Sequence, residues 1–300
     1  MPVSRAALKL ADEGLDIAFG TSVMALRAIC GTWQRVEAEP TAVHDRFPSW
    51  TWPDTFAAAT APLEGLPFGN PIAFRDLCRD KVLFQEHLEL PMPEIVTDPG
   101  QFEAALEDWG AAFLKPRFGG LGRGVRRVVP GDPLPVAVDG AVAGVREPSF
   151  LQRAVPPPRG LAGLSSRWLW QREPCGAWTF AGGVARISKD DPVTNVDRGA
   201  RVEPVDEALG PATLDEADAV CRAVCAQLED PCIVEVGLDL VVDCGGHVHV
   251  IEANSRPGGR LRALGPRFHE QHVEACARPL RALHALSGAT SDRPGQMAVS

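Results

Sequence analysis

A group of basic residues and glycines between positions 115 and 127 has the composition of a phosphate-binding segment. Its positive charges are Lys115, Arg117, Arg123, Arg126 and Arg127, and no acidic residue lies among them although the chain has a net charge of −9. The glycines between them are Gly119, Gly120, Gly122 and Gly124. Glycine lets backbone N–H groups approach an anion closely, and a lysine ammonium adds a compact positive charge. The stretch therefore predicts a site for phosphate.

The order of these residues differs from two common phosphate loops. A Walker A loop places its lysine after the glycines, followed by Ser or Thr, and a protein-kinase loop has the pattern G-x-G-x-x-G. Here Lys115 precedes the glycines, which read G-G-L-G-R-G. A glycine-rich hairpin with solvated arginines is the alternative interpretation of this segment alone.

A second group of chemically competent residues lies in "CIVEVGLDLVVDCGGHVHVIEAN", residues 232–254. Gly245-Gly246 is a two-residue turn signal, which would pair Cys244 with His247 and place Asp239 opposite Glu252. Asn254 would share their face. Like charges that face each other destabilise a sheet, whereas Mg²⁺ prefers such oxygen ligands. The pattern predicts a Mg²⁺ site, unless the register slips by one residue and both acids are solvated.

The composition is that of a globular protein of one to three domains. The 300 residues are 45% hydrophobic and 23% charged, and no stretch has the roughly 18 consecutive apolar residues of a membrane span. The N-terminus lacks the apolar core of a secretory signal, so we expect a cytoplasmic protein without a membrane partner. The acidic balance argues against nucleic-acid binding. The eight cysteines include no C-x-x-C pair and are expected to be free thiols.

Helical and strand patterns alternate along the chain, which predicts an α/β or α+β fold. We expect helical segments in 22–36, a loop over 46–56, one helix over 73–88, a helix over 101–109 that Gly110 ends, and a helix over 214–228. Strands are expected at 111–116, 149–155, 166–173 and 178–188, and turns with short strands over 130–148. Three prolines at 156–158 would end the strand before them.

These features in this order resemble the ATP-grasp superfamily over residues 71–262. The stretches that carry the resemblance are "NPIAFRDLCRDKVLFQEHLELPMPE", "FLKPRFGGLGRGV", "FLQRAV" and "GLDLVVDCGGHVHVIEANSRPGG". Together with "GVARIS" and "TNVDRGARV", they are most similar to YheC/YheD-type proteins and more distantly to RimK-like amino-acid ligases. Ser165 stands where the related proteins favour Asp, and the segment before residue 71 is shorter than their usual N-terminal domain.

The resemblance implies an α+β fold in which two lobes clasp ATP. Its parts would be an N-terminal segment (1–72), a small lobe with the glycine-rich loop (73–150), a large lobe with the metal hairpin (151–288) and a tail (289–300). ATP would be bound by Lys81, Lys115, Gly119, Gly120, Gly122, Arg123, Gly124, Gln152, Arg153, Ala154 and Val155. Mg²⁺ or Mn²⁺ would be held by Asp239, Glu252 and Asn254. Catalysis would use Arg186, Lys115 and Asn254, and substrate would contact Arg167, Asn195, Arg201, Arg256 and Arg260.

The function that the resemblance implies is an ATP-dependent carboxylate–amine ligase that forms an amide or peptide bond through an acyl phosphate. Its substrates would be a small carboxylate and an amine, such as an amino acid or peptide. Two alternatives stay open: a nucleotide-binding structural or regulatory protein without turnover, and a small-molecule kinase on the same fold. The oligomeric state is left open, with a dimer among the options.

Overall fold

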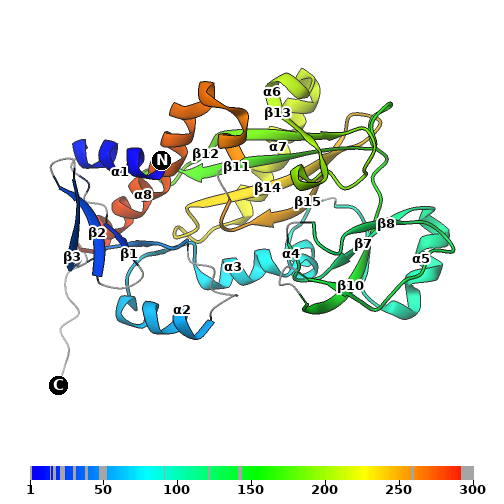
Figure 1. Cartoon of the computed structure of the whole chain (residues 1–300), viewed down its shortest axis with the longest axis horizontal. Helices are drawn as coiled ribbons and strands as arrows, with labels where there is room; N and C mark the ends of the chain where they lie inside the picture. Colours follow the sequence, from blue (N-terminus) through cyan, green and yellow to red (C-terminus); the bar gives the residue numbers. More distant parts are fainter. Residues whose placement is uncertain are drawn as a thin grey trace.

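Two antiparallel sheets form the body of the molecule and lie side by side in Figure 1. The computed structural model describes residues 2–13, 15, 18–20, 24–29, 32–37, 40–46, 53–90, 92–120, 122–140, 144–257 and 260–291. Helices and antiparallel sheets are mixed in both parts, so the fold class is α+β, as the sequence predicts.

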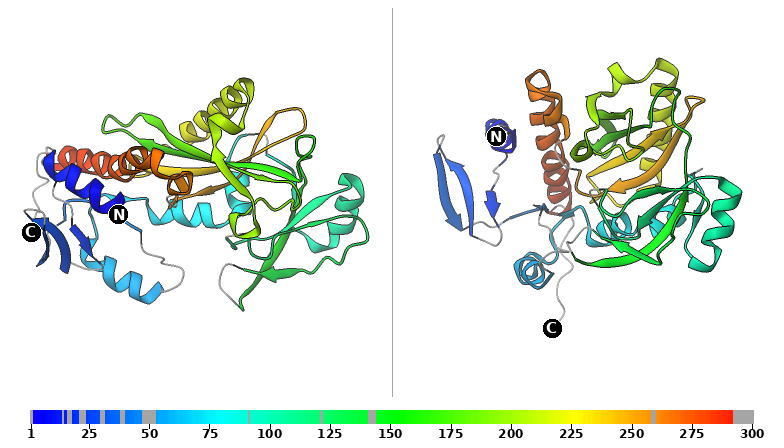
Figure 2. Two further views of the ribbon diagram at one scale, coloured as in Figure 1. Left: turned by 45° about the horizontal axis from the view of Figure 1, so that its top comes forward. Right: turned by 45° about the vertical axis from the view of Figure 1, so that its right-hand side comes forward.

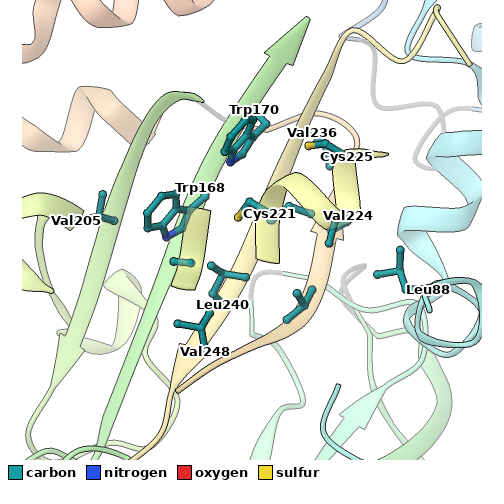
Figure 3. Close-up of a cluster of buried hydrophobic side chains, with 14 of the residues drawn as sticks. Leu88, Trp168, Trp170, Val205, Cys221, Val224, Cys225, Val236, Leu240 and Val248 are labelled. Carbon is teal, nitrogen blue, oxygen red and sulfur yellow. The ribbon is translucent and has the colours of Figure 1, made fainter. Parts of the chain in front are cut away.

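The larger sheet has the strand order β13-β12-β11-β14-β15. Its strands are β11 (Gly163–Arg172), β12 (Trp178–Ser188), β13 (Arg201–Pro204), β14 (Glu235–Val242) and β15 (Val248–Asn254). Helix α7 (Pro211–Gln227) covers one face, where Trp168 and Trp170 pack near Cys221 and Cys225 (Figure 3). Both cysteines are buried free thiols, as expected. The opposite face carries both apolar residues, such as Leu169 and Val184, which cluster with Leu261 and Ala275, and the charged residues Arg167 and Asp239.

The smaller sheet has the order β6-β10-β7-β8, with β9 paired to β10. Its strands are β6 (Ile95–Val96), β7 (Ala112–Pro116), β8 (Arg126–Val128), β9 (Ala137–Asp139) and β10 (Arg146–Arg153), and α5 (Phe102–Trp109) packs against it after the short helix η2 (Pro99–Gln101). Gly110 ends α5 with a φ of 69°, a left-handed conformation that glycine adopts without strain. The predicted helix, its stop and the following strand are confirmed.

The single helix expected over 73–88 is wrong, because two helices occupy this segment. α3 (Ile72–Arg79) ends at Asp80, and α4 (Lys81–His87) begins directly after it. The Asp80 carboxylate accepts hydrogen bonds from the backbone N–H groups of Val82 and Leu83 at 3.2 and 3.1 Å. An aspartate with this pattern is an N-cap, so it starts a new helix where the apolar spacing suggested a continuous one.

The expectation of helix over 22–36 is also wrong. Strands β2 (Met24–Ile29) and β3 (Thr32–Glu37) form a hairpin, and β1 (Ala18–Gly20) pairs with β2. The segment "TWQRVE" alternates and is rich in residues that favour strands, which outweighs the local helical spacing. Of the loop expected over 46–56, residues 47–52 lie outside the described residues and α2 (Pro53–Thr60) begins at its end.

The N-terminal segment packs against the C-terminal helix. α1 (Pro2–Asp12) lies beside α8 (His269–Ser291), where Ala6 and Leu10 cluster with Val273 and Ala277 (Figure 2). Strand β4 (Val43–His44) pairs in parallel with β5 (Phe68–Gly69), which leads into α3. The remaining short helices are η1 (Ala61–Leu63), η3 (Val196–Arg198), α6 (Val205–Ala208), η4 (Arg260–Leu264) and η5 (Pro266–Phe268).

The β14–β15 hairpin places Asp239 directly opposite Glu252, as predicted, although its tip differs from the prediction. Asp243 rather than Cys244 faces His247, so the loop has three residues instead of two. The register then shifts between Asp239 and Leu240, and Ile251 is the extra residue of β15. This bulge offsets the longer loop, because each changes the pairing by one residue. The slipped alternative, with both acids solvated, is excluded.

Candidate active-site cleft

A cleft of about 1490 Å³ lies at the face of the large sheet that carries Arg167, Arg186 and Asp239. It is bounded by β11, β12, β14 and β15, by the glycine-rich segment after β7, and by α2, η1 and α3 from the N-terminal part. Seven basic side chains line it against five acidic ones among the described residues, whereas the chain as a whole has a net charge of −9. The cleft is therefore a positive region in an acidic protein and favours anionic ligands.

A row of charged side chains crosses the large sheet inside this cleft. Arg167 on β11 pairs with Asp239 on β14, and Asp239 pairs with Glu252 on β15. Arg167 donates from Nε to Asp239 Oδ1 at 2.6 Å and from a terminal nitrogen to Oδ2, which makes a two-pronged contact. Arg186 on β12 donates to Asp239 Oδ1 at 3.1 Å. Neighbouring strands thus hold four charged groups at one place.

The electrostatics of this row differ from the sequence argument. Burial would raise the pKa of Asp239, but Arg167 and Arg186 outweigh it and hold that pKa well below its usual range. Burial and the neighbouring Asp239 raise the pKa of Glu252, whose contact with Arg167 is longer, at 3.8 Å. The repulsion between the two acids is therefore already reduced by two arginines. A divalent cation is not the sole means of stabilising this pair, contrary to the reasoning from sequence.

Lys81 and Lys115 are both buried at the cleft, with 9% and 8% of their surfaces exposed. Lys115 Nζ donates to Gln152 Oε1 at 2.5 Å, and Lys81 Nζ donates to the carbonyl oxygens of Gly119 and Pro116. Burial lowers the pKa of Lys115 to about 8, with a contribution from Lys81. Two ammonium groups that are buried at one cleft have the charge and the donors that phosphate oxygens would accept from.

The glycine-rich segment lines the cleft with Gly119, Gly120 and Gly122, while Gly124 and the exposed Arg123 lie outside the lining. Gly122 has a φ of 69°, and a Cβ atom there would come within 3.2 Å of the side-chain nitrogen of Asn195. The left-handed backbone and the close approach of Asn195 therefore both favour glycine at position 122.

Only some of the other residues expected at the site line the cleft. Asn195, Arg256 and Asn254 line the cleft. Arg201 does not: it pairs with Glu203 at 2.9 Å on β13, and 67% of its side chain is exposed. Of the segment expected to contact adenine, Gln152 is buried against Lys115, and none of residues 152–155 is part of the lining. The side chain of Arg260 lies outside the described part of the chain.

The oxygen-bearing side chains of the hairpin have the donor chemistry that Mg²⁺ prefers. Asp239, Glu252 and Asn254 lie on one face of β14 and β15. The amide nitrogen of Asn254 is buried with no hydrogen-bond partner among the described residues, so the protein does not fix this amide. No group of three or more His, Cys, Asp or Glu side chains placed for a metal occurs in the described ranges. The three side chains offer oxygen atoms of the kind that a cation such as Mg²⁺ prefers, and the Asp239 carboxylate also accepts hydrogen bonds from two arginines.

The cleft also contains residues that the sequence reasoning missed. Arg75 on α3 lines the cleft and forms an ion pair with Asp45, to which Arg256 also donates. Glu147 on β10 lines the cleft as well. In the sequence, Arg75 is one of many arginines on an amphipathic helix, and Glu147 precedes a proline in a turn-rich region, so neither has a local signal.

Comparisons with known proteins agree with this architecture. Residues 165–284 match the family model described as YheC/D like ATP-grasp. The chain resembles the solved structure of the ATP-grasp ligase PsnB in complex with minimal precursor, Mg and ADP, with a TM-score of 0.54 and 17% identity over 95% of this chain and 94% of that one. This chain has an ATP-grasp fold. No curated protein sequence matches it significantly.

Two further solved structures share the ATP-grasp fold at low identity. D-alanyl-alanine synthetase A from Vibrio cholerae has a TM-score of 0.54 and 18% identity, over 89% of this chain and 84% of that one. A carboxyaminoimidazole ribonucleotide synthetase from Thermus thermophilus has a TM-score of 0.52 and 21% identity, over 77% of this chain and 59% of that one. This chain therefore spans less than two thirds of the Thermus thermophilus synthetase. None of its described helices is long and apolar enough to cross a membrane.

Proposed function

We propose that this chain is an ATP-dependent ligase that joins a carboxylate to an amine through an acyl phosphate and releases ADP and phosphate. The observation that carries the proposal is the charged row of Arg167, Asp239, Glu252 and Arg186 beside two buried lysines, in a positive cleft of an ATP-grasp fold. Two of the similar structures are named for an ATP-grasp ligase and for a D-alanyl-alanine synthetase, which supports this reaction class.

Lys81 and Lys115 would bind the phosphates of ATP, and the backbone of 119–122 would close over them. Asp239, Glu252 and Asn254 would hold Mg²⁺ or Mn²⁺, which when bound neutralises phosphate charge and favours transfer of the terminal phosphoryl group. The similar structure of PsnB was solved in complex with Mg and ADP, which supports this assignment. Adenine contacts by residues 152–155 remain part of the proposal.

Arg186 and Arg167 would stabilise the negative charge that develops on the transferring phosphoryl group and on the acyl phosphate. Their guanidinium groups are already oriented by Asp239, so little reorganisation is needed during the reaction. An amine would then attack the acyl carbon, and phosphate would leave. Asn195 and Arg256, which line the cleft, are the remaining residues proposed for substrate binding.

A covalent thioester route is disfavoured by the state of the nearby thiol. Cys78 lines the cleft, but burial and the neighbouring Glu252 raise its pKa well above the usual range. A protonated thiol is a weak nucleophile. The proposed reaction therefore uses no side-chain nucleophile.

The test is to incubate the protein with Mg·ATP, a panel of carboxylic acids and hydroxylamine. We expect a hydroxamate together with equal amounts of ADP and phosphate. Lys115→Ala should slow its formation about 10- to 150-fold, because a buried contact to phosphate contributes about 1.5–3 kcal/mol, whereas Lys9→Ala on α1, a lysine outside the cleft lining, should leave the rate unchanged. A stable phosphate ester without phosphate release would indicate a kinase. Tight ATP binding without any ADP would indicate a protein without turnover.

A further inference from the structure

The cleft continues beyond the proposed phosphate-binding residues into a compartment whose wall is largely apolar, although Thr60, Glu64 and Asp76 also line it. Its side chains come from α2, η1, β5 and α3 and include Phe56, Ala57, Leu63, Leu66, Phe68 and Ile72. The whole cleft, at about 1490 Å³, exceeds the roughly 300–1,000 Å³ of a typical single-ligand pocket. There is therefore room for a second ligand beside a nucleotide.

A pair of arginines lies where this compartment meets the large lobe. Arg75 on α3 and Arg256 after β15 both donate to the same oxygen of Asp45. The Arg75 guanidinium lies over the ring of Phe56 at 4.7 Å and near that of Phe68 at 5.8 Å. Both arginines line the cleft, while Asp45 is buried and is not part of the lining. The buried Asp45 carboxylate thus binds both guanidinium groups from outside the cleft lining.

Arg75 and Arg256 share the Asp45 carboxylate, and the acidic Glu64 and Asp76 line the same part of the cleft. Burial lowers the pKa of both Arg75 and Arg256, which reflects the cost of their charge there. The nearby Arg46 is matched by Glu235 at 2.9 Å, and Asp76, which also acts on Arg75, is exposed to solvent. Two partly desolvated guanidinium groups that lie together in the lining of a cleft are suited to donate to a ligand carboxylate.

We propose that this compartment binds the acid substrate of the ligase, and that this acid combines a carboxylate with an apolar group. The carboxylate is received by Arg75 and Arg256, and the apolar part lies against the wall formed by α2, η1 and α3. The inference rests on the proposed function and deepens it, because it names the substrate class: small apolar or aromatic carboxylic acids rather than short polar ones.

The experiment is calorimetric titration of 3-phenylpropionate into the full chain, with and without Mg·ADP. Acetate lacks the apolar group, and 3-phenylpropanamide lacks the charge. We expect both to bind at least about tenfold more weakly than 3-phenylpropionate, because acetate loses the apolar contact and 3-phenylpropanamide loses the charge-assisted hydrogen bonds to the arginines. Inorganic phosphate should not displace 3-phenylpropionate.

Matched variants locate the ligand. Arg256→Gln should weaken 3-phenylpropionate binding about tenfold or more, and Arg256→Lys should weaken it less, while Arg222→Gln on the exposed face of α7 should leave it unchanged. Ile72→Asn should reduce the preference over acetate, whereas Leu83→Asn, outside the cleft lining, should not. Ile72 is 52% exposed and Leu83 45%, so both variants should fold.

The outcomes separate this inference from the ligase proposal. Equal binding of the three probes, displacement by phosphate, or unchanged affinity in both Arg256→Gln and Ile72→Asn would overturn the subsite. If 3-phenylpropionate binds as expected but no acid in the hydroxylamine assay gives ADP, the ligase proposal fails while the subsite stands. If small polar acids give hydroxamate and apolar ones do not, the ligase stands and the subsite is wrong.

Discussion

Replacing Asp80 by Ala should destabilise the protein and weaken nucleotide binding together. Asp80 caps α4 by accepting the N–H groups of Val82 and Leu83, and Arg117 donates to it from Nε and a terminal nitrogen at 2.7–3.0 Å. The next residue is Lys81, the first residue of α4 and a proposed phosphate ligand. The variant therefore disturbs the start of the helix that positions that lysine.

The size of the effect follows from the two interactions lost. An N-cap contributes about 1 kcal/mol, within a range of about 0.5–2 kcal/mol. The ion pair is partly solvated, since 37% of the Arg117 side chain is exposed, and contributes about 0.2–1 kcal/mol. Asp80→Ala should thus lower the free energy of unfolding by about 1–3 kcal/mol. Asp80→Asn keeps a capping oxygen and loses the charge, so it should cost less than 1 kcal/mol.

Urea unfolding followed by tryptophan fluorescence measures these free energies, and calorimetric titration of Mg·ATP measures affinity. Arg117→Gln is the matched control, because it removes the ion pair and leaves the cap. We expect Asp80→Ala to be the least stable of the three and to bind ATP several-fold more weakly. Equal losses in Asp80→Ala and Asp80→Asn would refute the capping argument, and unchanged ATP affinity would refute the link to Lys81.

Three further outcomes are expected. ATP affinity should fall as pH rises through about 8, where buried Lys115 loses its charge, and Lys115→Arg should flatten this profile in titrations between pH 7 and 9.5. Gly122→Ala should weaken ATP binding, whereas Gly131→Ala, with a φ of 90° and open space around it, should cost only about 1 kcal/mol of stability. Burial acts to raise the pKa of Glu235, but Arg46 and other partners lower it overall. The ionised Glu235 carboxylate therefore stabilises the folded protein at neutral pH, and this contribution is lost as the pH falls. Glu235→Gln should reduce the acid dependence of the free energy of unfolding in urea.

Local signals in the sequence were sufficient for the elements with strong caps and turns. Gly110 marked the end of α5, and the turn glycines of 245–246 led to the correct facing of Asp239 and Glu252. The correct pairing of Asp239 with Glu252 depended on two departures from the predicted hairpin that no sequence pattern shows. The three-residue loop and the bulge at Ile251 each shift the pairing by one residue, and the two shifts cancel. Asp80 has the residue type of an N-cap, but the continuous apolar spacing on both sides of it indicated a single helix.

Contacts between distant segments could not be read from the sequence. Arg167 reaches Asp239 because β11 pairs with β14, which follows only after β12, β13 and α7. Arg75 meets Arg256 through Asp45, which lies in the N-terminal segment. Such pairings depend on how strands and lobes assemble, whereas spacing along the chain reports only which side of one element a residue occupies.

The most direct test of the proposed acyl-phosphate mechanism follows oxygen from the acid to the released phosphate. The protein is incubated with Mg·ATP, amines and carboxylic acids labelled with oxygen-18 in the carboxylate, and the phosphate is analysed by mass spectrometry. An acyl phosphate carries a bridging carboxylate oxygen that leaves with phosphate, so we predict one labelled oxygen per phosphate, with ADP as the other product. Unlabelled phosphate, or AMP with pyrophosphate, would contradict the account.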